Sequence, residues 1–573
     1  MVVQNKRWTY QPVEDNSVID ALSESLNNLD KSLCEILVKR GISNYEEAKK
    51  FFRPSLDDLH PPFLMKNLEA GAKRLLKAID NNEKILIYGD YDVDGTTSVA
   101  LVYSFLSKHT QNIDFYIPDR YTEGYGISYE GINYAKANGF SLIIALDCGI
   151  KAVEKINYAN ENNIDFIICD HHTPGEQIPD CIVLDPKQND CNYPYKELSG
   201  CGVGFKLLQG FCLLKSIPFD ELYEFLDLLA VSISADIVPL TGENRVLTYY
   251  GIQKINKSPR PGIKALLEKA GIKKVLTVSD LVFTIAPRIN ASGRLETGKK
   301  AVELLIANDI TTAEEKAAEI HQLNIDRKDV DTKITQEALE MIAANPKASE
   351  LKSTVLFKED WHKGVVGIVA SRVIETYYKP TIILTESNGK ATGSARSVSG
   401  YNVYDAIDQC AHLLEQFGGH KYAAGLTLSL ENIEAFIEKF EEVVSATIPD
   451  ELLIPEIKID AVLSIQQIVA KGFYKVLKQF APFGPQNMNP VFKSENLQLK
   501  EPPRLLGETK DHLKLKVFQP ENEHIVLDAI GFNLGMFADE LDLGVPFSMV
   551  YTIDENEWNG VKSLQLKIKD IKV

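Results

Sequence analysis

The 573-residue sequence lacks features that define whole classes of protein. None of its eight cysteines forms a C-x-x-C pair, which removes the common zinc and thiol-redox motifs. No apolar run approaches the roughly 18 residues of a membrane span, and the polar N-terminal stretch has no apolar core of a signal peptide. We therefore expect a cytoplasmic protein with buried free thiols and no membrane segment.

Positive charge is also scarce. Lys and Arg number 62 against 80 Asp and Glu, and the net charge of −18 excludes an all-over electrostatic grip on nucleic acid. A local basic groove stays compatible with this balance. The length requires several domains, because single cores stop growing well below it. A polyanionic substrate would therefore have to be met by a focused basic site.

One stretch combines a buried strand with closely spaced acids. The apolar run 85–88 leads through Gly89 into Asp90, Asp92 and Asp94 at alternate positions. Carboxylates this close repel one another unless a cation lies between them, and a divalent metal ion is the natural candidate. The alternative is a solvated turn, because Asp is a common turn residue. The stretch alone does not decide between these two interpretations.

Apolar runs and helical patterns alternate after this stretch, which predicts a parallel sheet with crossover helices. Ligands of such sheets gather beyond the carboxyl ends of the strands. Asp147 follows the run 142–146, and Asp170-His171-His172 follows the run 166–169. Three strands would thus deliver acids or imidazoles to one edge, which Asp236 joins from a later segment. A helix cap for Asp147 and a solvated loop for the histidines are the alternatives.

Five carboxylates and one imidazole at one sheet edge suit two divalent ions, the arrangement that catalyses phosphoester hydrolysis in two-metal enzymes. Mostly oxygen ligands with a single histidine favour Mn²⁺ or Mg²⁺ over zinc. The joint occurrence of these residues is more specific than any one of them. We therefore predict a two-ion site.

The rest of the chain divides by pattern. We predict a helical accessory segment over 1–75, a parallel-sheet domain over 76–310, a long connecting helix over 311–346, a second α/β domain over 347–448 and a small β-barrel over 449–573.

Three local predictions accompany this division. Thr312 and Glu315 form a capping-box pattern that opens the long helix. The run from Pro287 to Leu295 holds two arginines among turn-forming residues. The aromatic residues Phe492, Phe518 and Trp558 are candidates for stacking on nucleic-acid bases.

Four motifs carry a resemblance to a known family: Gly89 to Gly95, Asp147-Cys148-Gly149, Asp170-His171-His172 and Ala235 to Leu240. They resemble the motifs of the DHH phosphoesterase superfamily. Further stretches, among them Gly418-Gly419-His420, are similar to its RecJ branch of single-strand-specific DNA exonucleases. The similarity spans nearly the whole chain. A small departure is Ser292, where the family pattern has Ala.

The resemblance implies a fold and a ligand set. The fold would be α/β: a parallel-sheet DHH phosphoesterase domain, a long helix, a smaller DHH-associated domain and a C-terminal OB-like β-barrel. One ion would be held by Asp92 and Asp147, with Asp90 either a direct ligand or a support for its neighbours. The other ion would be held by four residues, Asp94, Asp147, His171 and Asp236.

The resemblance also implies residues that contact substrate. His172 would lie beside the scissile phosphate and Arg288 near the cleaved linkage. The 5′-phosphate would be read by Arg120, Ser394 and Arg396, with His420 on the substrate side of the second domain. Bidentate guanidinium contacts suit phosphate recognition.

The implied function is metal-dependent 5′→3′ degradation of single-stranded DNA to mononucleotides, in DNA repair and recombination. The expected protein is a monomer whose partners are single-stranded DNA, a helicase and a single-strand DNA-binding protein. One alternative is a DHH phosphodiesterase of oligoribonucleotides or cyclic dinucleotides, or a pyrophosphatase, although the long barrel-bearing chain speaks against a small substrate. Another is a catalytically silent DNA-binding scaffold, against which the complete ligand set speaks. Polarity and the choice of DNA over RNA rest on resemblance alone.

Overall fold

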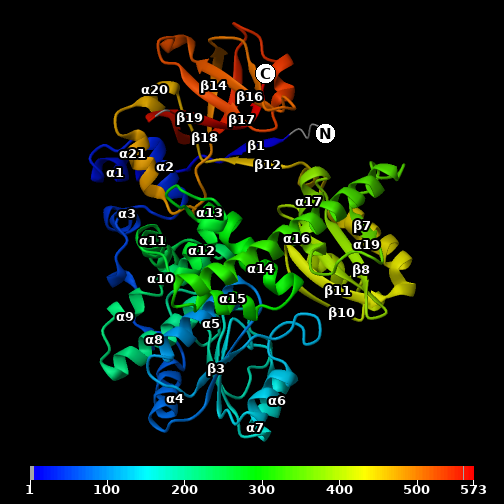
Figure 1. The fold of residues 1–573 in the computed structure, drawn as a ribbon. Coiled ribbons are helices and arrows are strands. Elements are labelled where there is room, and N and C mark those ends of the chain that lie inside the picture. The colour runs from blue at the N-terminus through cyan, green and yellow to red at the C-terminus, as the bar shows by residue number, and fades with distance from the viewer. Residues whose placement is uncertain (1–5, 559) are drawn as a thin grey trace.

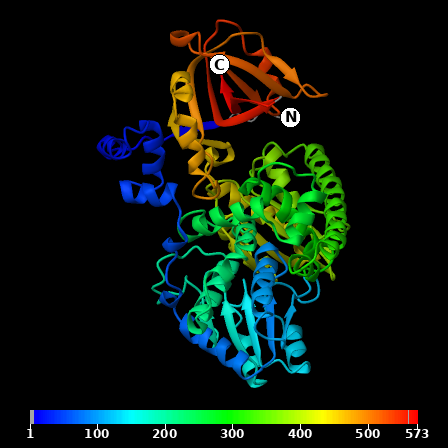
Figure 2. The same ribbon diagram turned by 60° about the vertical axis from the view of Figure 1, so that its left-hand side comes forward.

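The computed structural model describes residues 6–558 and 560–573, which form three bodies (Figure 1). A parallel-sheet lobe with a block of helices is joined by one long helix to a second α/β lobe, and a strand-rich body lies at the far end of the molecule (Figures 1 and 2). The predicted fold class is confirmed. Within the described residues, no helix is both long and apolar enough to cross a bilayer.

Five parallel strands form the first sheet, in the spatial order β3-β2-β4-β5-β6. Their bounds are β2 (Ile85–Gly89), β3 (Ile113–Tyr116), β4 (Leu142–Leu146), β5 (Asp165–Cys169) and β6 (Ile182–Leu184). One face is covered by α4 (Leu68–Asp80), α5 (Val93–Leu106) and α8 (Gly200–Lys215), the other by α6 (Tyr129–Ala137) and α7 (Val153–Glu161). Because both faces are buried, β2 is apolar throughout rather than alternating.

The turn from β2 into α5 is tight enough to require glycine. A Cβ on Gly89 would lie 2.4 Å from Val99 Cγ2, and one on Gly95 would lie 2.4 Å from the carbonyl oxygen of Asp90. Asp92 caps α5, because its Oδ1 accepts from the Gly95 amide at 3.0 Å. The glycines and this cap together fix the acidic turn at the sheet edge.

A block of helices follows the first sheet: α9 (Asp220–Tyr223), α10 (Leu226–Ala235), α11 (Gly242–Lys257), α12 (Pro261–Lys269), α13 (Val278–Asp280), a π-helical turn η3 (Leu281–Ile285), α14 (Ala286–Leu295) and α15 (Lys299–Leu305). The run from Pro287 to Leu295, with its two arginines among turn-forming residues, is helical. Proline is tolerated in the first helical turn, where an unbonded N–H costs nothing. Gly293 serves close packing, because a Cβ there would lie 2.5 Å from the Tyr91 carbonyl oxygen.

The long helix α16 (Ile310–Ala344) has 35 residues and connects the two lobes. At 1.5 Å per residue it is about 52 Å long. Its N-cap is Asp309, which accepts from the Thr312 amide at 2.9 Å, so the prediction that Thr312 opens the helix as its cap is wrong. Asp is at least as good an N-cap as Thr, and the helix begins earlier to use it.

The second lobe contains a five-stranded sheet in the order β10-β11-β9-β8-β7. Its strands are β7 (Thr354–Phe357), β8 (Thr381–Ser387), β9 (Lys390–Arg396), β10 (Gln416–His420) and β11 (Ala423–Ser429), with helices α17 (Val366–Thr376), α18 (Val403–Asp408) and α19 (Ile433–Thr447). Only β7 and β8 run parallel; the other neighbours are antiparallel. His420 lies on β10, the edge strand.

The third body joins both ends of the chain. Its seven-stranded sheet contains β13 (Ala461–Val462), β14 (Phe492–Leu499), β15 (Arg504–Leu506), β16 (His512–Phe518), β17 (Leu527–Gly531), β18 (Phe547–Trp558) and β19 (Val561–Lys572), with helices α20 (Ile465–Val469) and α21 (Phe473–Leu477) beside it. The N-terminal helices α1 (Asn16–Ser25), α2 (Lys31–Lys39) and α3 (Tyr45–Phe52) share its core, and β1 (Arg7–Tyr10) pairs with β12 (Glu456–Ile459). The predicted accessory segment therefore has no core of its own.

The aromatic candidates for base stacking in this body do not face solvent. Phe492 is fully buried and Phe518 is nearly so, because both belong to the apolar interior of the sheet. The prediction that they stack on bases is therefore wrong. The side chain of Trp558 lies outside the described part of the structure.

A buried ion pair on α16 generates a prediction about stability. Asp331 Oδ2 lies 2.6 Å from Arg327 Nη1, and its Oδ1 lies 2.7 Å from Arg372 Nη2 on α17. Asp331→Asn should lower the free energy of unfolding by about 3–5 kcal/mol, because it leaves the buried Arg327 without a counter-charge. Urea unfolding measures this change.

The matched control is Asp329→Asn on the exposed face of the same helix, which should change stability by no more than about 0.5 kcal/mol. Equal stabilities of the two variants would contradict the assignment of a structural ion pair.

Candidate metal centre

The predicted acidic residues converge at the carboxyl edge of the first sheet. Asp90 and Asp92 follow β2, Asp147 follows β4, and His171 follows the adjacent β5. Asp236 reaches the same place from the carboxyl end of α10. The neighbouring parallel strands end in register, so four chain segments meet at one point.

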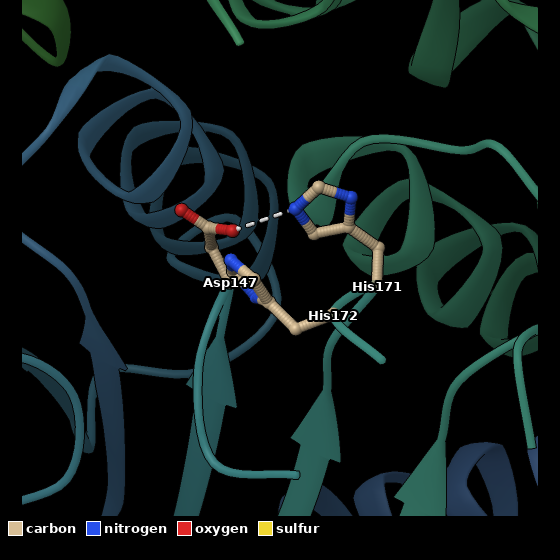
Figure 3. A group of neighbouring side chains, drawn as sticks. All are labelled: Asp147, His171 and His172. Atoms are coloured by element: carbon tan, nitrogen blue, oxygen red, sulfur yellow. Dashed lines mark ion pairs between the residues drawn. The ribbon is translucent and has the colours of Figure 1, made fainter. Parts of the chain in front are cut away.

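The ligand atoms form two overlapping groups. Asp147, His171 and His172 bring one ligand atom each within 4.8 Å of one another (Figure 3), and so do Asp94, His171 and Asp236. His171 Nε2 lies 3.2 Å from Asp147 Oδ1, 3.5 Å from Asp236 Oδ2 and 3.8 Å from Asp94 Oδ2. His171 belongs to both groups and stands at the centre of the cluster.

Asp94 is held by a helix N-terminus. One carboxylate oxygen accepts from the Gly200 amide at 2.6 Å, and the other accepts from the Cys201 amide at 3.0 Å and from the Ser232 hydroxyl at 2.6 Å. The amides belong to the first turn of α8, where unpaired N–H groups and the helix dipole favour an anion. These three hydrogen bonds fix the orientation of the Asp94 carboxylate.

Several ligand atoms are buried and have no hydrogen-bond partner. They are both carboxylate oxygens of Asp90, Asp147 Oδ1, both ring nitrogens of His171 and Asp236 Oδ2. An orphaned buried polar atom costs free energy unless something binds it. Oxygen donors with one imidazole are what Mn²⁺ and Mg²⁺ accept, so the donor set fits these ions.

The pKa shifts are those expected of a cluster of carboxylates that binds a cation. Burial, and then the charge of neighbouring aspartates, raises the pKa of Asp90, Asp92, Asp147 and Asp236. Burial lowers the pKa of His171 to about 4, so its imidazole is neutral at physiological pH. The short distance from His171 to Asp147 is therefore no ion pair, and the neutral imidazole is the form that binds metal.

Asp170 and His172 form a second pair beside the ligands. His172 Nδ1 lies 2.7 Å from Asp170 Oδ1, and Asp170 also accepts from the amides of His171 and Ile150. Burial raises the pKa of Asp170, but the bond and charge of His172 and these amide bonds outweigh it and bring the value to about 2. The Asp170 carboxylate in turn outweighs the effect of burial on His172 and raises its pKa. His172 Nε2 is 3.3 Å from the hydroxyl of Tyr125.

The predicted phosphate-binding residues come from both lobes. Arg120 stacks on the Tyr91 ring at 5.0 Å in the first lobe. On β9 of the second lobe, Arg396 Nη1 donates to Ser394 Oγ at 2.6 Å. Gly367 lets both approach α17, because a Cβ there would lie 2.8 Å from Arg396 Nη2. His420 is exposed on β10, and burial, then the charge of His172, lowers its pKa.

Sequence reasoning missed Arg294, which joins this group. Its Nη1 donates to the Gly364 carbonyl oxygen at 3.0 Å across the two lobes. Burial, and then the charges of Arg120, Arg327 and Arg396, lowers its pKa to about 10. It is one of the two arginines noted among turn-forming residues, and nothing in the sequence indicated which partners it would have. The role of Tyr125 beside His172 was missed as well.

Arg288 does not join the carboxylate cluster. Its Nη1 donates to the Thr284 carbonyl oxygen at 2.6 Å and its Nε to His321 Nδ1 at 3.3 Å. Thr284 lies on η3 and His321 lies on α16, so neither partner belongs to the carboxylate cluster. A role of Arg288 near the cleaved linkage stays a prediction.

Three family models match the chain. The family model described as "DHH family, N-terminal domain" matches residues 84–233, the DHHA1 domain model matches 350–446, and the RecJ OB domain model matches 459–570.

Known relatives show to which branch of the family the chain is most similar. A Bacillus subtilis protein named single-stranded-DNA-specific exonuclease RecJ is 39% identical over 577 residues, which span 100% of this chain and 72% of the relative. An Escherichia coli protein of the same name is 34% identical over 96% of this chain and 98% of its own length. The crystal structure of RecJ from Thermus thermophilus in complex with Mn²⁺ matches with a TM-score of 0.84 and 28% identity, over 99% of this chain and 79% of that chain. The chain belongs to the RecJ family.

The raised carboxyl pKa values generate a prediction for metal binding. A carboxyl group with a raised folded-state pKa loses stabilising free energy as pH rises from its unfolded to its folded value. A bound cation reverses this loss, because it binds the deprotonated form and releases protons. Saturating Mn²⁺ should therefore raise the Tm more at about pH 8 than at about pH 6. Scanning calorimetry at both pH values measures the difference.

Asp147→Asn serves as the control for this measurement and should reduce the Mn²⁺-induced rise in Tm at each pH. A rise that is independent of pH, or is unchanged in this variant, would show that Mn²⁺ binds elsewhere.

Proposed function

We propose that this protein is a metal-dependent exonuclease that degrades single-stranded DNA in the 5′→3′ direction to mononucleotides, in DNA repair and recombination. Two neighbouring features carry the proposal. One is the group of buried carboxylates with orphaned oxygens, and the other is the pair Arg120, which stacks on the ring of Tyr91 next to Asp90, and Arg294, which bonds to Gly364 of the second lobe. The first group fits divalent cations and the second fits a phosphate. Membership of the RecJ family supports the choice of substrate.

The ions would be Mn²⁺ or Mg²⁺, both of which occur in crystal structures of RecJ from Thermus thermophilus. Two sets of ligands would hold them: Asp92 and Asp147 with Asp90, and Asp94, Asp147, His171 and Asp236. When bound, such ions activate water and neutralise charge on the phosphate. The orphaned oxygens of Asp90 support a ligand role for it over a purely supporting one.

The side chains around the ions position the substrate. Asp170 holds His172 through Nδ1, which leaves Nε2 directed away from it toward Tyr125. The Asp170 carboxylate raises the pKa of His172 and so favours its protonated form, which would stabilise negative charge developing on the scissile phosphate. Arg120 and Arg396, with Ser394, would hold the 5′-phosphate. This fixes the distance between the strand end and the cleaved bond.

The wider setting follows from the family. We propose a cytoplasmic monomer that requires a helicase to open duplex DNA and meets strands covered by a single-strand DNA-binding protein. The two lobes touch at Arg294 and Gly364. We propose that duplex DNA is excluded from the site between them.

Loss of the shared ligand should abolish hydrolysis. Asp147→Ala removes the carboxylate expected to contact both ions, and turnover should fall by at least about a hundredfold, more than for loss of an outer-shell partner. Initial rates with Mn²⁺ on a long single-stranded DNA measure this effect. Asp180→Ala is the control, because this exposed carboxylate lies away from the cluster. Near-wild-type turnover of Asp147→Ala would refute the assignment.

The strand end and the substrate class can be tested together. Degradation of end-labelled DNA should begin at the 5′ end, stop when that end is blocked, and spare a blunt duplex. Arg396→Met should raise the KM for 5′-phosphorylated strands by about tenfold or more and that for 5′-hydroxyl strands less, because a charge-assisted bond is lost only in the first case. Faster hydrolysis of dinucleotides or cyclic dinucleotides than of long DNA would favour the small-substrate alternative.

A further inference from the structure

The loop that carries Asp236 is strained. Asp236 ends α10, where its amide donates to the Ser232 carbonyl oxygen at 2.9 Å. The next residue, Ile237, has a φ of +61°. This left-handed conformation is usual after a helix end, but glycine normally occupies it, and a β-branched side chain there is an outlier. Ile237 is 67% exposed, so burial of its side chain does not offset the strain.

Contacts further along the loop hold it instead. The carbonyl oxygen of Pro239 accepts from the Tyr195 hydroxyl at 3.1 Å and from Asn244 Nδ2 at 3.0 Å. The Leu240 amide donates to the carbonyl oxygen of Pro485 at 2.8 Å. Pro485 belongs to the third body, so a segment remote in sequence bonds to the loop four residues after Asp236.

The turn that contains Pro485 fits closely against Leu240. A Cβ on Gly484 would lie 3.1 Å from Leu240 Cδ2 and 3.3 Å from its Cβ, so a methyl group there would press on the Leu240 side chain and require it to move. Asn487 Nδ2 donates to the carbonyl oxygens of Phe480 and Pro482 and so closes the turn from its other side.

Arg245 on α11 locks this turn to the first lobe. Its guanidinium donates to the carbonyl oxygens of Phe480, Ala481 and Pro482, and to that of Phe51 at the end of α3. It also stacks on the Phe51 ring at 3.9 Å. Arg245 is 5% exposed, and no described carboxylate forms an ion pair with it. Its guanidinium N–H groups donate to backbone carbonyl oxygens of the third body instead.

We infer that the turn 482–485 of the third body, locked by Arg245, is a positioning element for Asp236 and holds its carboxylate toward His171 for a divalent cation. This inference rests on the proposed role of Asp236 as a metal ligand. The segment 236–245 is fixed at one end by α10 and at the other by Arg245, and the strained residue lies between them. In Figure 1 helix α3 of the third body lies next to α11.

The test compares Mn²⁺ binding by four full-length variants with that of the wild type. Arg245→Met removes the lock, Gly484→Ala inserts a methyl group between turn and loop, Asp236→Ala removes the proposed ligand, and Tyr250→Phe is the matched control. Tyr250 lies on the same helix α11, and its hydroxyl donates to the carbonyl oxygen of Pro54 at 3.0 Å. Pro54 follows α3 in the chain and is not part of the Asp236 loop. Calorimetric titration gives the Kd and the number of ions, at a temperature where each variant is folded by circular dichroism.

Arg245→Met should raise the Kd for Mn²⁺ of the affected ion by about tenfold or more, as loss of an outer-shell partner does. Gly484→Ala should raise it in the same direction, and Tyr250→Phe should leave it unchanged. Saturating Mn²⁺ should restore hydrolysis by Arg245→Met, with an unchanged KM for DNA. Partial unfolding would instead lower the number of ions bound at an unchanged Kd, so the two effects separate.

A rescue variant sharpens the test. Glycine adopts the left-handed conformation without a Cβ clash, so Ile237→Gly removes the strain at this position. The double variant Ile237→Gly/Arg245→Met should therefore bind Mn²⁺ more tightly than Arg245→Met alone. Unchanged Kd values in both Arg245→Met and Gly484→Ala, with a weakened Asp236→Ala, would overturn the inference. Unchanged Mn²⁺ binding and hydrolysis in Asp236→Ala would overturn the proposed ligand role itself.

Discussion

Mutual repulsion of buried carboxylates is the constraint on which the site depends. Asp90, Asp92, Asp147 and Asp236 are drawn together at one sheet edge where burial and like charge both disfavour ionisation. The fold tolerates this arrangement because the sheet behind it is packed between two apolar clusters. A divalent cation would replace this repulsion by attraction to each carboxylate. The same closeness of charge that raises the pKa values therefore favours metal binding.

The site is assembled by all three bodies. The first lobe carries the carboxylates, the second carries Arg396 and His420, which are predicted to bind substrate, and α16 connects the two lobes. The third body reaches the Asp236 loop through Pro485 and Arg245. Distant segments therefore act on the chemistry through short backbone contacts, which links metal binding to the arrangement of the whole chain.

The sheet and its acidic edge were predictable because both follow from local patterns and from one rule of parallel sheets. Features set by tertiary contact were not. The run from Pro287 to Leu295 has turn-forming residues but is helical, since packing against Tyr91 outweighs propensity. The N-terminal helices share a core with the C-terminal sheet, a pairing that no periodicity reveals. Arg294 and Arg245 gain their roles only from partners far along the chain.

The central claim is that two divalent ions share Asp147. Anomalous diffraction at the manganese edge, from crystals grown with Mn²⁺, tests it most directly. The account predicts two peaks about 3.5–4 Å apart, each with an oxygen of Asp147 in its coordination sphere and one with His171 as a ligand. No peak at this edge of the sheet, or a single ion that does not touch Asp147, would contradict it.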